Sequence, residues 1–420
     1  MSLKPNNYMP RLIDKKIDDL LQVSGAISIE GPKWCGKTFT SLNYASSAID
    51  MDDEETRNRF ILNPELVLNE PKPELIDEWT REPAIWDKIR RKCDALETKG
   101  NYILSCSTSL IDENEIFHSG AGRISRLKMN TMSLFESNDS SGDISIMDMY
   151  EGKEIVKTVK KVSLEELANL IIRGGWPANI NVDKDKYGLM PKYYINSILE
   201  KDIYESKNVD SIKMQKLLKS LARNESTVVS NNKLIKDISD NDDLNIDKRT
   251  VSDYIEILEK LNLLSNQLSY SSNYRSPERV GKNVKRHFAD PSLAAALLNM
   301  NSSKLIDNLK TFGFLFEALV ERDLKIYMDY LGGNLYHFRD NVNGLEVDSI
   351  LEFENGEYAA VEIKLGFNQY KEACESLLKF QNNVTKKPKF MCVICGYNEN
   401  IVKDKETGIY IVPITALKPE

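Results

Sequence analysis

The feature that most constrains this chain is the octapeptide GPKWCGKT at residues 31–38. It fits the phosphate-loop pattern G-x-x-x-x-G-K-[ST] and directly follows the strand-like run AISIE at residues 26–30. In such a loop, successive backbone N–H groups and the N-terminus of a helix face the phosphates of a nucleotide. The pattern therefore predicts a strand, a phosphate-binding loop and a helix, in that order.

Each residue type in the loop has its own physical role. Gly31 and Gly36 let the backbone approach the phosphates closely. Lys37 supplies a cation for the β- and γ-phosphates, and Thr38 supplies an oxygen for Mg²⁺. We expect ATP or GTP, with Mg²⁺, to contact every residue of the segment Gly31, Pro32, Lys33, Trp34, Cys35, Gly36, Lys37, Thr38 and Phe39.

Two later strand ends add residues suited to nucleotide hydrolysis. The run PELIDEW ends in the acidic pair Asp77 and Glu78, of which the first would support Mg²⁺ and the second orient the attacking water. The run YILSCS brings Ser105, a candidate sensor of the γ-phosphate. The alternative is that these are solvated strand ends and turn residues. Their order after the loop favours an ATPase in which Lys37 and Glu78 are catalytic and Thr38 and Asp77 hold Mg²⁺.

Length, charge and cysteine content bound the remaining possibilities. A chain of 420 residues is too long for one ordinary core, so two or three domains are expected. The formal net charge of -8 requires any nucleic-acid partner to bind a local patch. The sequence has no apolar signal core at its start and no run of about 18 apolar residues, and its six cysteines are scattered. These features predict a cytoplasmic protein with reduced thiols and no membrane partner.

Three zones follow one another along the chain. Residues 1–136 alternate short apolar runs with helical stretches, which is typical of a parallel sheet with crossover helices. The polar stretch 137–143 predicts a loop or hinge. Residues 144–280 are largely helical, and their order of three helices and a hairpin favours a winged helix. Residues 284–420 begin with helices and continue with strands around one further helix, which predicts an independent α/β domain.

The last zone carries charged residues in a pattern typical of metal-dependent nucleases. Asp348 lies in one expected strand, while Glu362 and Lys364 share a face of the next, which can pair with the first. This is the D…E-x-K arrangement of the restriction-endonuclease-like superfamily, in which carboxylates hold Mg²⁺ or Mn²⁺ and the lysine stabilises charge. Glu317, on the preceding helix, is a third candidate ligand. The alternative is an edge strand with a solvated polar face.

Two further residues near this pattern have open roles. Glu346 shares a strand face with Asp348 and is either a replacement ligand or solvated. Gln369 lies just downstream and could support Lys364 or a substrate. The histidines His118, His287 and His337 have no ligand spacing, and we interpret them as ordinary structural or surface residues.

The order of these elements resembles the prokaryotic AAA-type ATPases of unassigned role, which carry a C-terminal domain of unknown function. The resemblance covers nearly the whole chain, through YMPRLIDKKIDDLL, GPKWCGKT, LIDEW, YILSCST, HSGAGRISRLKMNTMSLFES, GGWPA, KRHFADPSLAAALL, TFGFLFEALVERDL, GLEVDSILEFENGEYAAVEIKLG and GIYIVPITALKP. It implies an AAA-like α/β ATPase core followed by a winged helix. The chain departs from the family where such a strand commonly ends in Thr-Gly-Ser, because it has Ser105, Cys106 and Ser107 there.

The resemblance adds a candidate arginine finger. Arg123 and Arg126 occupy the basic stretch after the third strand, from which an arginine could reach a nucleotide, either of its own chain or of a neighbouring subunit in a homo-oligomer. The alternative is a surface arginine that pairs with an acidic helix.

The middle zone could either read DNA or act as a spacer. Lys248 and Arg249 open the helix that would enter a DNA groove. Asp253 lies in that helix, and the preceding loop 239–243 is acidic, which favours the spacer. The leading hypothesis is an ATPase whose nuclease-fold domain binds or cuts DNA or RNA. The alternative is an ATP-dependent DNA-binding or protein-binding switch with an inactive C-terminal domain.

Overall fold

The computed structural model describes residues 3–96, 98–107, 119–203, 209–239, 246–273, 275–276, 279, 284–340 and 343–420. The chain forms two compact units. Unit 1 consists of residues 1–131 with 257–263, and unit 2 consists of residues 132–256 with 264–420. His118 and residues 240–243 of the acidic loop, both considered above, lie outside the described residues.

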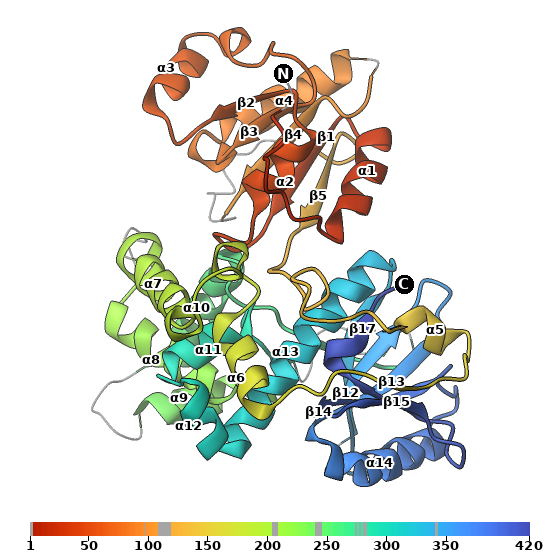
Figure 1. Ribbon diagram of the computed structural model, residues 1–420. Coiled ribbons are helices and arrows are strands. Elements are labelled where there is room, and N and C mark those ends of the chain that lie inside the picture. Colours follow the sequence, from red (N-terminus) through yellow and green to blue (C-terminus); the bar gives the residue numbers. More distant parts are fainter. Residues whose placement is uncertain are drawn as a thin grey trace. The chain divides into compact units, whose positions relative to one another are not determined.

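Unit 1 is built on a five-stranded sheet in the order β2-β3-β4-β1-β5, and each pairing is parallel. Its strands are β1 (Ala26–Glu30), β2 (Ser47–Asp50), β3 (Glu74–Asp77), β4 (Tyr102–Cys106) and β5 (Ile124–Lys128). Its helices are α1 (Ile13–Val23), α2 (Lys37–Tyr44), α3 (Glu54–Leu62) and α4 (Ala84–Ala95), with short 3₁₀ turns at Pro64–Leu66 and Trp79–Arg81. Figure 1 shows this unit in red to orange.

Helices cover both faces of this sheet because its strands are apolar on both sides. Ile27 and Ile29 of β1 pack in one hydrophobic cluster with Ile17 of α1, whereas Ala26 packs in a second cluster with Trp86 of α4. Successive strand residues point to opposite faces, so alternating residues enter different cores. The predicted parallel sheet with crossover helices is confirmed.

Unit 2 begins with a mainly helical region. Its helices are α5 (Ile146–Tyr150), α6 (Leu164–Arg173), α7 (Leu189–Ser197), α8 (Ser211–Arg223), α9 (Asn231–Ser239), α10 (Lys248–Lys260), α11 (Pro291–Leu297) and α12 (Ser302–Asp307), and a π-helical turn covers Ile198–Ile203. Short strands and turns join them: β6 (Ile144–Ser145), β7 (Val156–Thr158), β8 (Thr227–Val228), β9 (Leu268–Ser269), β10 (Lys285–Arg286) and 3₁₀ turns at Pro177–Asn179 and Lys184–Lys186. The antiparallel pair β8–β10 forms a small two-stranded ribbon within this region.

The rest of unit 2 is an α/β region around a mixed eight-stranded sheet in the order β7-β15-β16-β14-β13-β12-β11-β9. Its own elements are α13 (Leu309–Tyr330), β11 (Asn334–Asp340), β12 (Leu345–Glu352), β13 (Tyr358–Gly366), α14 (Tyr370–Asn383), β14 (Met391–Tyr397), β15 (Asn400–Lys403), β16 (Tyr410–Pro413), β17 (Leu417–Lys418) and 3₁₀ turns at Phe367–Gln369 and Ile414–Ala416. Strands β11, β12 and β13 pair antiparallel, and β13, β14 and β16 pair parallel.

Helix α14 covers one face of this sheet, as Figure 1 shows. Leu377 of α14 packs in a hydrophobic cluster with Ile350 of β12 and Ala360 of β13. Cys392 and Cys395 lie buried in β14, and burial raises the pKa of the Cys395 thiol to about 12. We therefore interpret them as core residues.

The segment that the sequence predicted as a loop or hinge is bound firmly to unit 2. The side-chain carboxylate of Asp323 in α13 accepts a hydrogen bond from the Leu134 backbone N–H at 2.9 Å. Arg173 of α6 pairs with Asp139 at 2.5 Å, and Ser140 donates a hydrogen bond to the Leu417 carbonyl at 2.7 Å. Residues 137–143 thus form a loop, but the contacts at 139 and 140 hold it in place.

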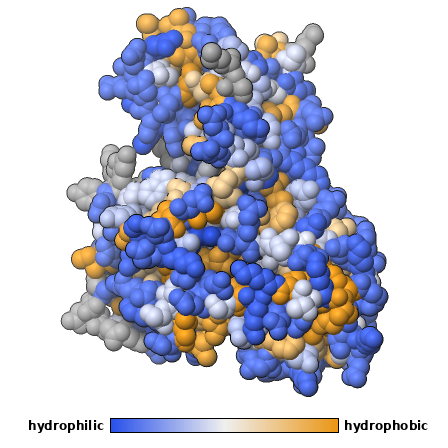
Figure 2. Space-filling model, in the orientation of Figure 1, coloured by the Kyte–Doolittle hydropathy of each residue, from blue (hydrophilic) through white to orange (hydrophobic). Residues whose placement is uncertain are grey.

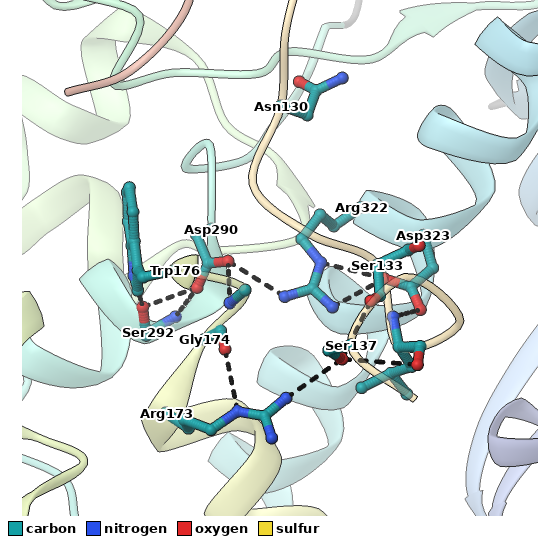
Figure 3. Close-up of polar contacts among 12 residues, drawn as sticks. Asn130, Ser133, Ser137, Arg173, Gly174, Trp176, Asp290, Ser292, Arg322 and Asp323 are labelled. Carbon is teal, nitrogen blue, oxygen red and sulfur yellow. Dashed lines mark hydrogen bonds and ion pairs between the residues drawn. The ribbon is translucent and has the colours of Figure 1, made fainter. Parts of the chain in front are cut away.

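A network of buried polar groups joins four parts of unit 2 (Figure 3). Arg322 bridges Asp323 of its own helix and Asp290 at the start of α11. Asp290 also accepts the Gly175 backbone N–H at 2.9 Å, and the indole of Trp176 donates to Ser292 at 2.9 Å. The sequence motifs GGWP and ADPS therefore meet at α13, which bears Asp323, the residue that holds Leu134.

Polar and charged residues dominate the face of the molecule drawn in Figure 2, and apolar residues appear there as separate groups. In the described parts of the chain, every helix is too short or too polar to cross a lipid bilayer.

Candidate functional site

The phosphate loop lies between β1 and α2, as its sequence predicted. Gly36 has φ of +106° and directly precedes α2, a conformation that glycine adopts without strain. Pro32 and Cys35 are buried beneath the loop, whereas the side chains of Trp34 and Phe39 are exposed. The loop therefore has one side packed on the sheet and one side facing solvent.

Lys37 closes the loop from within. Its ammonium donates hydrogen bonds to the carbonyl oxygens of Gly31 and Pro32 at 3.0 and 2.9 Å, and the residue is only 5% exposed. These bonds fix both the curvature of the loop and the position of the positive charge, at the N-terminal end of α2. A cation and a helix N-terminus at one point favour an anion such as a phosphate group.

The acidic residue of β3 lies beside the hydroxyl that follows the loop. Thr38 donates through Oγ1 to Oδ2 of Asp77 at 2.9 Å, and Ser105 donates to Oδ1 of the same carboxylate. Strand β4 lies between β1 and β3, so these residues meet at the carboxyl ends of three adjacent strands. The oxygen atoms gathered here are the ligand type that Mg²⁺ prefers, and the donor set fits that ion.

Glu78, the second residue of the acidic pair, is held by a serine hydroxyl, as Asp77 is. Ser107 donates to Oε1 of Glu78 at 2.9 Å. Because side chains two residues apart in a strand point the same way, Ser105 and Ser107 each contact one carboxylate of the pair. Glu78 itself has φ of +49° and thus turns the chain sharply where β3 ends.

Arg11 also stabilises the phosphate loop, although no pattern in the sequence indicated this role. Its guanidinium donates to the carbonyl oxygens of Cys35 at 2.8 Å and Asn130 at 2.9 Å, and it is 7% exposed. Its backbone N–H bonds Asp14 at 2.9 Å, which orients the segment before α1. The residues PRLID are adjacent in the sequence, but the hydrogen bond from Arg11 to the Cys35 carbonyl joins positions that are 24 residues apart.

The two arginines proposed as fingers lie elsewhere on the sheet. Arg123 directly precedes β5, whose first residue pairs with Ala26, so Arg123 lies at the end of the strands opposite the loop. It forms an ion pair with Asp94 at 2.7 Å and lowers the pKa of that carboxyl. Arg126 lies beside Ser28 in mid-strand and contacts the Trp86 ring. Its guanidinium also lies 3.6 Å from Glu30, the residue directly before the phosphate loop, whereas Arg123 is far from that loop.

The three residues of the C-terminal pattern do lie together. The Lys364 ammonium is 2.7 Å from Glu362 and 3.5 Å from Asp348, and Oδ2 of Asp348 accepts the Ile363 backbone N–H at 2.8 Å. Ser376 of α14 also donates to Glu362, at 3.3 Å. Burial, together with the nearby charge of Asp348, raises the pKa of the Glu362 carboxyl to about 8.

The third candidate ligand pairs with a cation from β10. Glu317 contacts the ammonium of Lys285, which is also 2.8 Å from Glu321 and 3.3 Å from the Asp348 carbonyl oxygen. Burial raises the pKa of Glu317 to about 8, while the positive charges of His287 and Lys285 hold the pKa of Glu321 at about 2. Among the described residues, no group of three or more His, Cys, Asp or Glu is arranged to hold a metal ion.

The residues with open roles lie at the margin of this region. Glu346 is exposed, which fits the solvated alternative. Gln369 is also exposed and accepts a hydrogen bond from the Gly366 backbone N–H at 3.5 Å.

The candidate DNA-contacting helix is α10. Asp247 accepts the Thr250 backbone N–H at 2.7 Å and so caps the start of this helix. Lys248 is exposed, and the side chain of Arg249 is 91% exposed at 4.0 Å from Asp253. Nearby, a cavity of about 580 Å³ at the β8–β10 ribbon is lined by residues that include Lys233 and Arg286.

Comparisons with known families divide the chain in the same order. Residues 24–138 match a family described as "AAA domain". Residues 164–304 match "Domain of unknown function (DUF8612)", and residues 312–417 match "Domain of unknown function (DUF4143)". The chain therefore carries an AAA-type P-loop domain of the kind that binds ATP and Mg²⁺, followed by two domains without an assigned function.

The chain is also similar to solved structures of an ATPase and of two DNA-bound proteins. The Walker-type ATPase PABY2304 of Pyrococcus abyssi is 12% identical, with 71% of this chain and 98% of that chain covered and a TM-score of 0.44. The ORC1 protein of Aeropyrum pernix in complex with DNA is 12% identical, with coverage of 73% and 97% and a TM-score of 0.28. The replication initiator DnaA bound to AMPPCP and single-stranded DNA is 13% identical, with coverage of 59% and 86% and a TM-score of 0.28.

Similarity at this level carries no information on substrate or partner. No curated protein matches the sequence.

Proposed function

We propose that the protein hydrolyses ATP at the phosphate loop of unit 1 and that its C-terminal domain has a restriction-endonuclease-like fold that binds or cuts nucleic acid. The observation that carries the first part is the convergence of Lys37, Thr38 and Asp77 at one edge of the sheet. Bound Mg²⁺ would supply a positive charge that neutralises the phosphate oxygens.

Each residue of the proposed ATP site has a separate role in hydrolysis. Lys37 holds the β- and γ-phosphates and already has its charge fixed by two loop carbonyls. Thr38 and Asp77 present oxygens for Mg²⁺, and Ser105 keeps the Asp77 carboxylate in place. Glu78, held by Ser107, orients a water molecule towards the γ-phosphate.

The ATP site is tested by Lys37→Ala. Loss of a charge-assisted contact is expected to weaken ATP binding at least ~10-fold, since such a bond contributes about 1.5–3 kcal/mol. Binding is measured by calorimetry, and circular dichroism checks that the fold is intact. Lys88→Ala, at an exposed position on α4, is the matched control and should bind ATP normally. An unchanged ATP affinity in the folded Lys37→Ala protein would exclude the proposed site.

Helix and strand order supports the fold proposed for the C-terminal domain. The helix α13, the antiparallel strands β11, β12 and β13, the helix α14 and the parallel strand β14 follow one another. Asp348 on β12 and Glu362 and Lys364 on β13 lie in contact, as the D…E-x-K pattern requires. The proposed ligands for Mg²⁺ or Mn²⁺ are Asp348 and Glu362, with Glu317 as a further candidate.

Nucleic-acid cleavage is tested with DNA and RNA substrates in the presence of Mg²⁺ or Mn²⁺. The proposal expects cutting by the wild-type protein and none by Asp348→Ala, whereas Glu346→Ala, at an exposed position on the same strand, should retain activity. If neither substrate is cut but nucleic acid binds in an ATP-dependent manner, the alternative of a regulatory switch is favoured.

We also propose that α8, α9, α10 and the β8–β10 ribbon form a winged helix. The cations near the ribbon, Lys233 and Arg286, line a cavity that could contact a phosphate backbone. Arg123 could act as a finger only on the nucleotide of a neighbouring subunit, because it lies at the end of the sheet opposite the loop. Arg126 lies 3.6 Å from Glu30, directly before the loop, and could contact the nucleotide of its own chain or of a neighbouring subunit. A mixed assembly of Lys37→Ala and Arg126→Ala chains tests this, since active sites would then form between complementary subunits.

A further inference from the structure

A buried lysine from the β8–β10 ribbon occupies the acidic cluster of the C-terminal domain. The ammonium of Lys285 contacts Glu317, lies 2.8 Å from Oε1 of Glu321 and 3.3 Å from the carbonyl oxygen of Asp348. The Lys285 side chain is 4% exposed, so solvent does not screen this charge. Three of its contacts are oxygens that come from two separate elements, α13 and β12.

A second cation from the same segment fixes this arrangement. His287 is 3.2 Å from Glu225 through Nδ1 and 2.6 Å from Glu321 through Nε2, the latter as an ion-pair contact outside hydrogen-bond geometry. Glu225 also accepts the Phe288 backbone N–H at 3.2 Å. The short strand β10 and the residues after it are therefore tied to α13 at two successive inward-facing positions.

Lys285 contacts Asp348, which is also a ligand of the proposed metal site. Asp348 offers its backbone carbonyl to Lys285 and its side-chain carboxylate to Lys364. Two ammonium groups thus flank the residue that a divalent cation would need. Mg²⁺ and Mn²⁺ bind carboxylate oxygens at about 2.0–2.2 Å, and an ammonium placed 2.8 Å from Glu321 fills the space that such an ion would take.

The charges of the buried cluster also favour a cation at the position of Lys285. Removal of a charge from a buried cluster leaves the opposite charges uncompensated, so the buried carboxylate of Glu321, whose pKa is lowered, requires a cation. Lys285 provides one covalently, from a segment that is not part of the C-terminal α/β region.

We propose that Lys285 is the resident cation of the acidic site formed by Glu317, Glu321 and Asp348, and that the β8–β10 ribbon thereby holds this site closed to divalent metal ions. The ribbon is then an autoinhibitory element of the protein without nucleic acid, and metal binding and cleavage require nucleic acid to displace Lys285. This inference deepens the function proposed for the C-terminal domain and rests on it.

The test is Mn²⁺ binding to the full chain, measured without nucleotide by the electron paramagnetic resonance signal of the free ion. Lys285→Met should bind one additional Mn²⁺ at least ~10-fold more tightly than the wild-type protein binds it. Adding Asp348→Asn to Lys285→Met should abolish that binding, which locates the ion. The control is Lys325→Met, which removes an ammonium from α13, the helix that bears Glu317 and Glu321. Lys325 donates a hydrogen bond to Ser265 at 2.7 Å, and its replacement should leave Mn²⁺ binding as in wild type.

A second pair of variants guards against loss of folding. Lys285→Gln keeps an N–H donor for Glu321 without the charge and should also gain the Mn²⁺ site, whereas Lys285→Arg keeps the charge and should not. The proposal is wrong if folded Lys285→Met and Lys285→Gln bind Mn²⁺ no better than wild type. It is equally wrong if wild type already binds Mn²⁺ in the Asp348-dependent manner when no nucleic acid is present.

These outcomes separate the inference from the function beneath it. Metal-dependent cutting by the wild-type protein, with no gain of Mn²⁺ affinity in Lys285→Met, supports the nuclease and rejects the closed site. Gain of the Mn²⁺ site without cutting by any variant supports the closed site and rejects the nuclease.

Discussion

At the scale of single residues, the candidate ATP site depends on how each carboxylate is held. Asp77 is bound by Thr38 and Ser105, and Glu78 is bound by Ser107. Both carboxylates therefore have fixed positions relative to the loop. Their neighbours are hydroxyl groups, which can hold an oxygen ligand or a water molecule without adding charge.

Glu78→Gln should separate ATP binding from ATP hydrolysis. The amide keeps the size of the side chain and an oxygen for Ser107, but it orients the water molecule less well and cannot accept its proton. The expected result is an unchanged affinity for ATP and a turnover lowered about 10²-fold or more. Phosphate release and calorimetry measure the two quantities. Glu82→Gln, four residues away, should change neither, and wild-type turnover in Glu78→Gln would rule out the assigned role.

At the scale of elements, the contacts of GGWP explain why two glycines occur together. A Cβ at Gly175 would overlap the backbone of Met132, and one at Gly174 would overlap Asp290 and Ser292. Gly174 also has φ of +67°, a value that other residues rarely adopt. The turn after α6 can therefore pack this closely only with glycine.

Gly175→Ala should destabilise unit 2 by about 1–3 kcal/mol, because overpacking forces the backbone apart. The control is Gly313→Ala, within α13, where a Cβ would meet nothing within 4 Å. That change should stabilise the chain slightly, since glycine in a helix costs about 0.5–1 kcal/mol relative to alanine. Urea unfolding followed by circular dichroism compares the two. Equal midpoints for both variants would contradict the packing argument.

At the scale of the whole molecule, the buried ion pairs of unit 2 make its stability depend on pH. The carboxylates of Glu321 and Glu225 raise the pKa of His287 to about 9 against the opposing effect of burial. Burial raises the pKa values of Glu317 and Glu362 to about 8. Each of these groups binds its proton more tightly in the folded chain than in the unfolded chain.

The unfolding temperature is therefore expected to fall as pH rises from about 6 to 9. The contribution of His287 is fully present below its unfolded pKa of about 6.5 and is lost through pH 9, and the protonated carboxyls lose theirs between about pH 4.5 and 8. Glu321, with a lowered pKa of about 2, acts in the opposite direction but only below about pH 4.5. Calorimetry at a series of pH values measures the slope, which His287→Gln should reduce. A flat or rising profile would contradict this assignment.

Part of the fold could be predicted because its signals are local. Short apolar runs between helical stretches indicated the strands of unit 1, and the sequence around Gly31–Thr38 defined the loop. The acidic pair could also be located, because it directly ends β3. The C-terminal pattern was visible for a similar reason, since Glu362 and Lys364 are two residues apart and Asp348 pairs through an adjacent strand.

The remaining contacts could not be predicted because their partners are far apart in sequence. Lys285 and Glu321 are 36 positions apart, and Leu134 and Asp323 are 189 apart. No periodicity relates such positions, so the sequence indicated only a structural or surface role for His287 and a loop or hinge at residues 137–143. The position of Arg123 also depends on strand order, since parallel pairing of β5 with β1 puts it at the end of the sheet opposite the loop of its own chain.

By itself, the sequence determined the phosphate loop, the parallel sheet around it and the acidic and basic residues of the C-terminal strands, because all of these follow from spacing over a few residues. Only the tertiary structure decided which of those charges meet. The order of strands put Ser105 beside Asp77, and the packing of β10 on α13 put Lys285 among carboxylates. Which buried charges pair across long sequence separations depends on how whole helices and strands pack, and a local sequence pattern contains no information about that packing.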